Sequence, residues 1–157
     1  MQQELPSDPS LHPPPPASSS LSSVCRTARC VCGGFRVNVR GDPARVSICH
    51  CFACQQRTGS VFGCQSRFPE ADVTFEGESK TYVRVGDAGG IISYRFCPTC
   101  GTSVTWTIDQ MPGNIIVAIG CFSDPTCFPA PTFSVYEARA FPWALACVAA
   151  ECAVHWD

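Results

Sequence analysis

Short segments in which apolar and polar residues alternate follow one another along this chain, and turn-forming residues separate them. Phe35–Arg40 alternates strictly, which predicts a strand with one buried face. Glycine, aspartate and proline fill the intervals, as in 41–43 and 86–90, where they favour tight turns. Further strands are predicted at 44–48, 62–68, 72–75, 80–85, 91–96, 102–108, 114–122 and 133–137. The pattern therefore predicts an all-β domain.

The two ends of the chain differ from this pattern. Residues 1–24 contain four consecutive prolines and several serines, with too few apolar groups to offset the entropy of ordering. We expect a disordered Pro/Ser-rich tail there, with a proline-rich ligand for a partner domain as the alternative. Residues 25–157 are expected to form one folded domain. Its alanine- and cysteine-rich segment, 144–153, is consistent with a loop or a short helix.

Cysteine usage bears on the cellular compartment. Thirteen cysteines in 157 residues could form the disulfide framework of a secreted domain. However, the count is odd, seven cysteines lie at metal-ligand spacings, and the first residues carry Glu4 and Asp8 without the features of a secretory signal. No segment approaches the about 18 apolar residues that a membrane span requires. We therefore expect a cytoplasmic protein with reduced thiols and no membrane contact.

The charge balance disfavours nucleic-acid binding. The chain has 11 Lys and Arg against 13 Asp and Glu, and no basic cluster exceeds two residues. Proteins bind nucleic acids chiefly by neutralising phosphates. DNA and RNA are therefore not expected partners.

The first candidate site is the segment 47–60. Cys49, Cys51 and Cys54 have the spacing Cys-x-Cys-x-x-Cys, and a short helical turn at 52–56 would place the last two on one side. Three thiolates can bind one zinc ion and leave its fourth position open, as reactive zinc sites do. His50 lies between these ligands and is expected to point to solvent or to be hydrogen-bonded.

A second set of cysteines offers a closed site. It consists of Cys30 and Cys32 before Gly33-Gly34, and of Cys97 and Cys100 before Gly101. Cys-x-x-Cys-Gly is typical of a zinc knuckle. A thioredoxin-type redox pair has the same spacing but opens a helix, whereas a strand is predicted here at 102–108.

The chemistry of an open three-thiolate zinc site favours thiols as substrates. Such a site has a net charge of −1, which weakens it as a generator of hydroxide but still lets it hold an incoming thiol as a thiolate. That thiolate would attack a small carbonyl compound. Arg57, Thr58 and Ser60 are candidates for binding a substrate carboxylate or the developing oxyanion, with a simple polar rim as the alternative.

We expect the remaining cysteines and two of the tryptophans to pack in the protein and to take no part in its chemistry. Trp106 and Trp143 are expected in the core or in a pocket wall. The cysteines without partner spacing are expected to be packing residues: Cys25, Cys64, Cys121, Cys127, Cys147 and Cys152.

In combination, these motifs resemble those of the family of glutathione-dependent formaldehyde-activating enzymes and centromere protein V. The resemblance covers about residues 26–157 and rests on motifs that occur in the family's order: Cys30-x-Cys32-Gly33, Cys49-His50-Cys51-x-x-Cys54-Gln55-x-Arg57-Thr58-Gly59-Ser60, Phe96-Cys97-x-x-Cys100-Gly101-Thr102 and Pro142-Trp143. Phe133-Ser134-Val135 stands where many members place a histidine before the final Pro-Trp.

This resemblance implies a fold, two metal sites and an activity. The fold would be Mss4-like, with coiled antiparallel sheets and zinc knuckles. Two zinc ions per chain would be bound, a structural one by Cys30, Cys32, Cys97 and Cys100 and a catalytic one by Cys49, Cys51 and Cys54. The activity would be that of a carbon–sulfur lyase joining glutathione to formaldehyde as S-hydroxymethylglutathione and reversing the reaction.

Two other classes of function stay open at this stage. One is a non-catalytic zinc module that binds a protein partner, and the other is a zinc hydrolase or a lyase for a different thioether. The physiological thiol and the oligomeric state are also left open.

Overall fold

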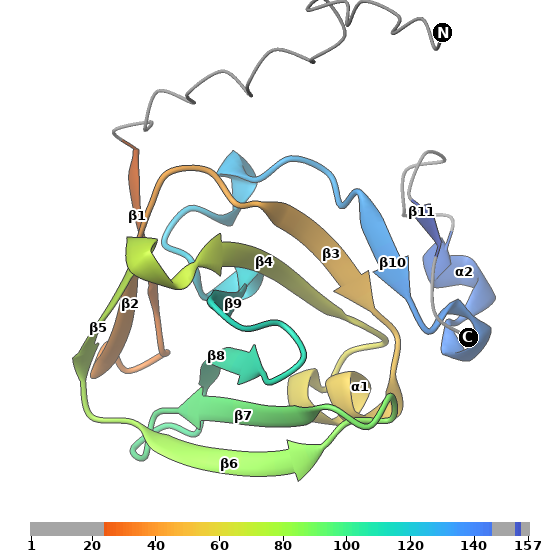
Figure 1. Ribbon diagram of the computed structural model, residues 1–157, viewed down its shortest axis with the longest axis horizontal. Coiled ribbons are helices and arrows are strands. Elements are labelled where there is room, and N and C mark those ends of the chain that lie inside the picture. Colours follow the sequence, from red (N-terminus) through yellow and green to blue (C-terminus); the bar gives the residue numbers. More distant parts are fainter. Residues whose placement is uncertain (1–23, 146–152, 155–157) are drawn as a thin grey trace, which may run out of the picture.

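The computed structural model describes residues 24–145 and 153–154 (Figure 1). The predicted tail at 1–24, except its last residue, lies outside the described residues, as do Cys147 and Cys152. Two sheets are present in the described part. The first contains β1 (Cys25–Arg29), β2 (Phe35–Arg40) and β5 (Val73–Gly77). The second contains β3 (Arg45–Cys49), β4 (Gly63–Pro69), β6 (Lys80–Val85), β7 (Ile91–Phe96), β8 (Ser103–Ile108), β9 (Asn114–Ala118), β10 (Phe133–Val135) and β11 (Ala153–Val154).

Helical structure in the described part is limited to short segments. The α-helices are α1 (Phe52–Thr58) and α2 (Pro142–Leu145). Single 3-10 turns occur at η2 (Glu70–Asp72), η3 (Ile119–Cys121), η4 (Pro125–Cys127) and η5 (Glu137–Arg139). None of the described helices is long and apolar enough to span a bilayer. The all-β prediction is confirmed.

The strand order places neighbours in sequence beside one another in most of the larger sheet. Its order is β11-β10-β3-β4-β9-β8-β7-β6. Pairing is antiparallel from β3 to β6, whereas β10 runs parallel to both β3 and β11. Figure 1 shows β3 and β4 facing β6 and β7 across the concave side of this sheet, with α1 near one end of the interval.

Of the predicted boundaries that differ from the observed ones, three have clear local reasons. The strand expected at 114–122 ends at Ala118, because the chain turns into η3. The one expected at 133–137 ends at Val135, because Tyr136 has a left-handed backbone with φ 60°. The helical turn expected at 52–56 continues to Thr58 and closes at Gly59, which is left-handed. Strand β1 was not predicted.

The main core lies between the two sheets. Strand β2 alternates as expected, with Phe35 and Val37 fully buried and Arg36 exposed. These side chains pack with buried residues of the larger sheet, among them Phe68 of β4 and Val104 of β8. Burying such side chains is worth about 1.5–3 kcal/mol each. The core therefore holds the small sheet against the back of β4, β8 and β9.

The contact between β5 and the β1–β2 turn yields a stability prediction. Gly77 has φ +82°, and a Cβ atom there would meet the carbonyl oxygen of Gly34 at 1.9 Å. Gly89 has φ +83° but open space around it. Gly89→Ala should cost about 1–2 kcal/mol for backbone strain alone. Gly77→Ala should cost about 1–3 kcal/mol more because the backbones must separate.

Denaturant unfolding of the zinc-loaded protein measures both free energies. Equal losses for the two variants would show that a Cβ atom at position 77 is accommodated without an extra steric cost, and would contradict this prediction.

Candidate metal centres

Two hairpin turns, each with a left-handed glycine, bring four cysteines together. Cys30 directly follows β1. In the turn after it, Gly33 N donates to Cys30 O at 3.0 Å, and Gly33 has φ 79°. In the β7–β8 turn, Gly101 N donates to Cys97 O at 2.9 Å, with Gly101 at φ 72°. Such conformations favour glycine because it lacks Cβ. The glycines noted in the sequence thus let each turn fold back and present two sulfurs.

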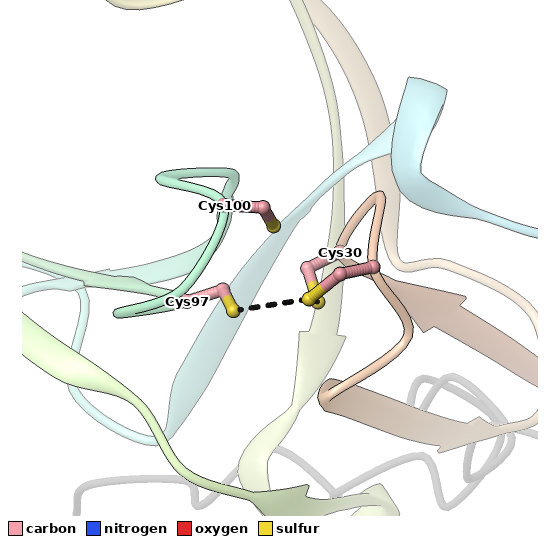
Figure 2. A group of neighbouring side chains, drawn as sticks. Cys30, Cys97 and Cys100 are labelled. Carbon is pink, nitrogen blue, oxygen red and sulfur yellow. Dashed lines mark hydrogen bonds between the residues drawn. The ribbon is translucent and has the colours of Figure 1, made fainter.

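The four sulfurs of these turns have the spacing of a tetrahedral zinc site. Cys32 Sγ lies 3.5 Å from Cys30 Sγ and 3.6 Å from Cys97 Sγ, and all four Sγ atoms, including that of Cys100, lie within 4.8 Å of one another. Figure 2 shows Cys30, Cys97 and Cys100 converging from the two turns. Zinc–sulfur bonds of about 2.3 Å in a tetrahedron place sulfurs about 3.8 Å apart. The residues present therefore fit zinc.

Hydrogen bonds to sulfur prepare this group for a cation. Phe35 N donates to Cys30 Sγ at 3.2 Å. Thr102 Oγ1 accepts from Val31 N at 3.2 Å and so has its own proton available for Cys100 Sγ, also at 3.2 Å. The Thr102 hydroxyl and nearby backbone donors lower the pKa of the Cys100 thiol to about 5. Cys100 is thus favoured as a thiolate, the form that binds metal.

The second cysteine group stands at the junction of β3 and α1. Cys49 ends β3, Cys51 caps the N-terminus of α1, and Cys54 lies in its first turn. Cys54 N donates to Cys51 Sγ at 3.4 Å. All three side chains are buried, and their Sγ atoms lie within 4.8 Å of one another. Among the described residues, no fourth histidine, cysteine or carboxylate joins this group.

Charge in this three-cysteine group is shared between the thiols. Hydrogen bonds from Cys49 and Cys54 lower the pKa of Cys51 to about 2, and the same interactions with Cys51 and Cys54 raise the pKa of Cys49. One thiolate is therefore stabilised at the expense of a second. Full deprotonation of the group requires a cation. Two arginines supply part of this charge, since Arg84 interacts electrostatically with Cys51 and Arg57 with Cys54.

A cavity of about 370 Å³ opens onto the three-cysteine group. The four-cysteine group contributes no residue to its wall. Aromatic and aliphatic side chains in the wall include Ile92, Tyr94, Trp106, Ile108, Ile116, Phe133, Val135 and Tyr136. Charged and polar side chains in the wall are Arg45, Ser47, Gln65, Arg67, Arg84, Asp87 and Gln110. The two cysteine groups therefore differ in access: one lies at the junction of two turns and the other at a ligand-sized cavity.

The predicted substrate-binding residues of the 57–60 segment do not line this cavity. The Arg57 guanidinium lies 4.4 Å from the centre of the Trp106 ring, and its Nε and Nη2 are buried without a hydrogen-bond partner. Thr58 Oγ1 donates to Cys54 O at 2.8 Å and accepts from Ser60 N at 3.2 Å. Arg57 thus lies behind the tryptophan wall, and the two hydroxyl residues lie at the end of α1.

His50 is buried and does not face solvent. Its side chain is 0% exposed and packs edge-on against Phe62 at 5.8 Å. Burial lowers the pKa of His50. The expectation of a solvent-facing ring is wrong, because the backbone of His50 continues β3 by donating to Val135 O and turns the ring inward.

Three of the structural roles need correction as well. Trp106 is buried in the cavity wall, as expected, but Trp143 is 63% exposed. Cys25 and Cys127 are exposed, not buried packing residues. Cys64 and Cys121 are half-buried, and Cys121 packs against the main core.

Four cavity residues carried no recognisable motif in the sequence: Arg45, Arg67, Arg84 and Tyr136. Arg45 lies on the same face of β3 as Cys49, and the strand register places Arg67 of β4 opposite Arg45. Neither relation can be read before the pairing of β3 with β4 is known. Tyr136 is the one described non-glycine residue with positive φ, and it packs against the three-cysteine group. Positive φ at such a residue is uncommon and clusters at functional sites.

Comparison with known proteins agrees with this architecture. The family model of the glutathione-dependent formaldehyde-activating enzyme matches residues 25–139, a span that contains both cysteine groups. The chain belongs to this family. The predicted resemblance is therefore confirmed, and the packed antiparallel sheets with two knuckle turns are consistent with the Mss4-like fold.

The similarity of this chain to individual proteins is weaker. Among solved structures, the crystal structure of a Rhodobacter sphaeroides protein matches with a TM-score of 0.49 and 19% identity, covering 62% of this chain and 87% of that one. No curated protein matches the chain.

The difference between the two groups predicts different effects of cysteine removal. Cys100→Ser should unfold the domain or lower its stability by several kcal/mol, since structural zinc contributes on the order of 10 kcal/mol in small domains. Cys54→Ser should leave a folded protein that has lost the second zinc ion. Thermal melting and zinc quantification measure both effects. Equal unfolding of the two variants would make the three-cysteine group structural as well.

Proposed function

We propose that this member of the family is a zinc-dependent carbon–sulfur lyase. It would join a thiol such as glutathione to a small carbonyl compound such as formaldehyde, and cleave the same adduct in reverse. The observation that carries this proposal is the contrast between the two groups: four thiols close a site between turns, whereas three buried thiols open onto a cavity of about 370 Å³. An open fourth position is the mark of a reactive zinc site.

The residue assignment follows the two groups. Cys30, Cys32, Cys97 and Cys100 would hold a structural zinc, and Cys49, Cys51 and Cys54 a catalytic one. A catalytic zinc bound there would supply a soft Lewis acid that lowers the pKa of an incoming thiol.

Residues around the three-cysteine group supply compensating charge. Three thiolates leave a zinc site at −1, and a further thiolate makes it more negative. Arg57 lies near Cys54, and Arg84 near Cys51, where their charges favour the thiolate forms. We assign Arg57 this supporting role, held in place by its stacking on Trp106. Direct substrate binding by Arg57, Thr58 and Ser60 stays a prediction.

The reaction needs one proton relocated and no oxidant. The thiol sulfur forms a bond to the carbonyl carbon, the π electrons of the carbonyl move to its oxygen, and the proton lost by the thiol ends on that oxygen. Tyr136 packs against the three-cysteine group, and burial raises the pKa of its phenol. The phenol therefore stays protonated at neutral pH and can donate a hydrogen bond to the developing alkoxide.

A non-catalytic zinc module explains these features less well. Such a module needs no cavity beside its metal, and its sites would both be closed. A hydrolase is disfavoured by the donor set, because three thiolates weaken the acidity of metal-bound water.

Addition of a thiol should change the sulfur count at the metal. With both sites loaded, zinc-edge X-ray absorption should give an average of about 3.5 sulfurs per zinc, from four and three. Glutathione should raise this average toward about 4, with the new sulfur at about 2.3 Å. The Cys54→Ser protein, which has lost the open site, is the control and should show no rise. No rise with any small thiol in the intact protein would end the lyase assignment.

Tyr136→Phe tests the proton-holding role. Loss of one hydrogen bond to the developing alkoxide should lower kcat by about 100-fold, while the dissociation constant of glutathione changes little. Tyr82→Phe is the matched control, because Tyr82 is exposed on β6 and outside the cavity wall. Unchanged kcat in Tyr136→Phe would remove Tyr136 from the reaction and leave the thiol-binding assignment standing.

A further inference from the structure

Two arginines face each other across neighbouring strands in the cavity wall. The register of β3 and β4 places Arg45 directly opposite Arg67, and both are half-buried. Like charges directly opposite on paired strands are destabilising. The charge of Arg45 and, to a larger extent, burial lower the pKa of Arg67. The fold therefore maintains an unfavourable pair of cations at this position.

Neither arginine has a carboxylate partner among the described residues. The ion pairs there join Arg26 to Asp42, Arg36 to Glu76, and both Arg84 and Arg139 to Asp87. Arg45 is instead stacked over the ring of Phe133, with 4.1 Å between its guanidinium carbon and the ring centre. Stacking leaves the edge of a guanidinium free to donate hydrogen bonds. Arg45 is thus held in position with its donors available.

These arginines lie on the same side of the sheet as the three-cysteine group. Side chains alternate along a strand, so Arg45, Ser47 and Cys49 of β3 share one face. The opposed residues of β4 are Arg67, Gln65 and Gly63. Apart from Gly63, all of these residues line the cavity. A polar stripe therefore runs along the wall from the thiol group, past a hydroxyl and an amide, to two guanidinium groups.

The length of this stripe restricts the ligand. Arg45 and Cys49 are four positions apart on β3, which places their Cα atoms about 13 Å apart. A fully extended tripeptide spans about 10 Å, and arginine side chains can cover the remainder. A single amino acid spans about 3.5 Å, so much more of the distance would fall to the side chains of the wall.

We propose that Arg45 and Arg67 together bind a carboxylate of the thiol substrate and so select extended, carboxylate-bearing thiols of about tripeptide length. Two guanidinium groups around one carboxylate offer bidentate, charge-assisted hydrogen bonds, and the ligand removes the repulsion between them. This inference rests on the proposed function, since it takes the sulfur of the ligand to lie at the three-cysteine group. It assigns specificity to β3 and β4 and not to Arg57.

Calorimetric titration of the zinc-loaded full chain tests the assignment. The ligands are glutathione, S-methylglutathione, which keeps the carboxylates but has no free thiol, and cysteine, which has both groups but is short. The variants are Arg45→Gln and Arg67→Gln, and Arg40→Gln is the control because Arg40 is exposed on β2 outside the cavity. X-ray absorption at the zinc edge is recorded on the same samples.

Each of the two cavity variants should weaken binding of glutathione and of S-methylglutathione by about 10- to 100-fold, as expected for a hydrogen bond to a charged group. Binding of cysteine should be unaffected, and Arg40→Gln should behave as wild type. The melting temperature of Arg67→Gln should stay equal or rise, because a repulsion is removed while the stacking of Arg45 on Phe133 is kept. A lower melting temperature would indicate a structural role and overturn the assignment.

The outcomes separate this inference from the proposed function. If glutathione adds a sulfur at zinc but neither variant weakens its binding, the arginine pair is not the carboxylate site, and the lyase proposal stands. If the variants weaken binding of both glutathione and S-methylglutathione but no thiol reaches zinc, the carboxylate site stands and the lyase proposal fails. If the wild-type protein binds neither glutathione nor S-methylglutathione, the carboxylate site is refuted.

Discussion

The convergence of four sulfurs between two hairpin turns is the constraint on which the rest of this structure depends. Cys32 and Cys97 are 65 positions apart, and their sulfurs lie 3.6 Å apart. A metal bound there joins the turn of the small sheet to the turn between β7 and β8. A crosslink over such a distance removes much of the freedom of the unfolded chain. It also fixes β7 and β8, which carry Tyr94 and Trp106 into the cavity wall.

Under the proposed function, this arrangement would allow the second cysteine group to react without endangering the fold. The three-cysteine group lies apart from these turns, at the C-terminal end of β3, where the strand passes into α1. The backbone there is already fixed by pairing with β4 and β10. A metal with an open position can therefore exchange ligands while the sheets stay packed. If the two groups have the proposed roles, their separation accounts for two thiol groups in one small domain.

The sequence was most informative where the determinants are local. Alternation predicted the bounds of β2, β6 and β7, and the spacing of the cysteines predicted both candidate ligand groups. It was least informative where contacts are distant. Strand β10 joins the sheet by parallel pairing with β3, a partner far away in the chain, and the opposition of Arg45 and Arg67 depends on strand register. Arg57 looked like a cavity residue because it follows the cysteine motif, yet stacking on Trp106 places it behind the wall.

Charge distribution along the cavity gives the ligand a direction. A zinc site with three thiolates is negative, so a carboxylate is repelled from that end, whereas a soft sulfur is stabilised there by bonding. At the other end, Arg45 and Arg67 offer two positive charges without a carboxylate partner in the described part of the chain. A ligand with a thiol at one end and a carboxylate at the other can satisfy both ends in one orientation only. Reversal would place an anion beside the thiolates and a thiol beside the arginines. The same two features that bind the substrate would therefore also place its sulfur where the reaction occurs.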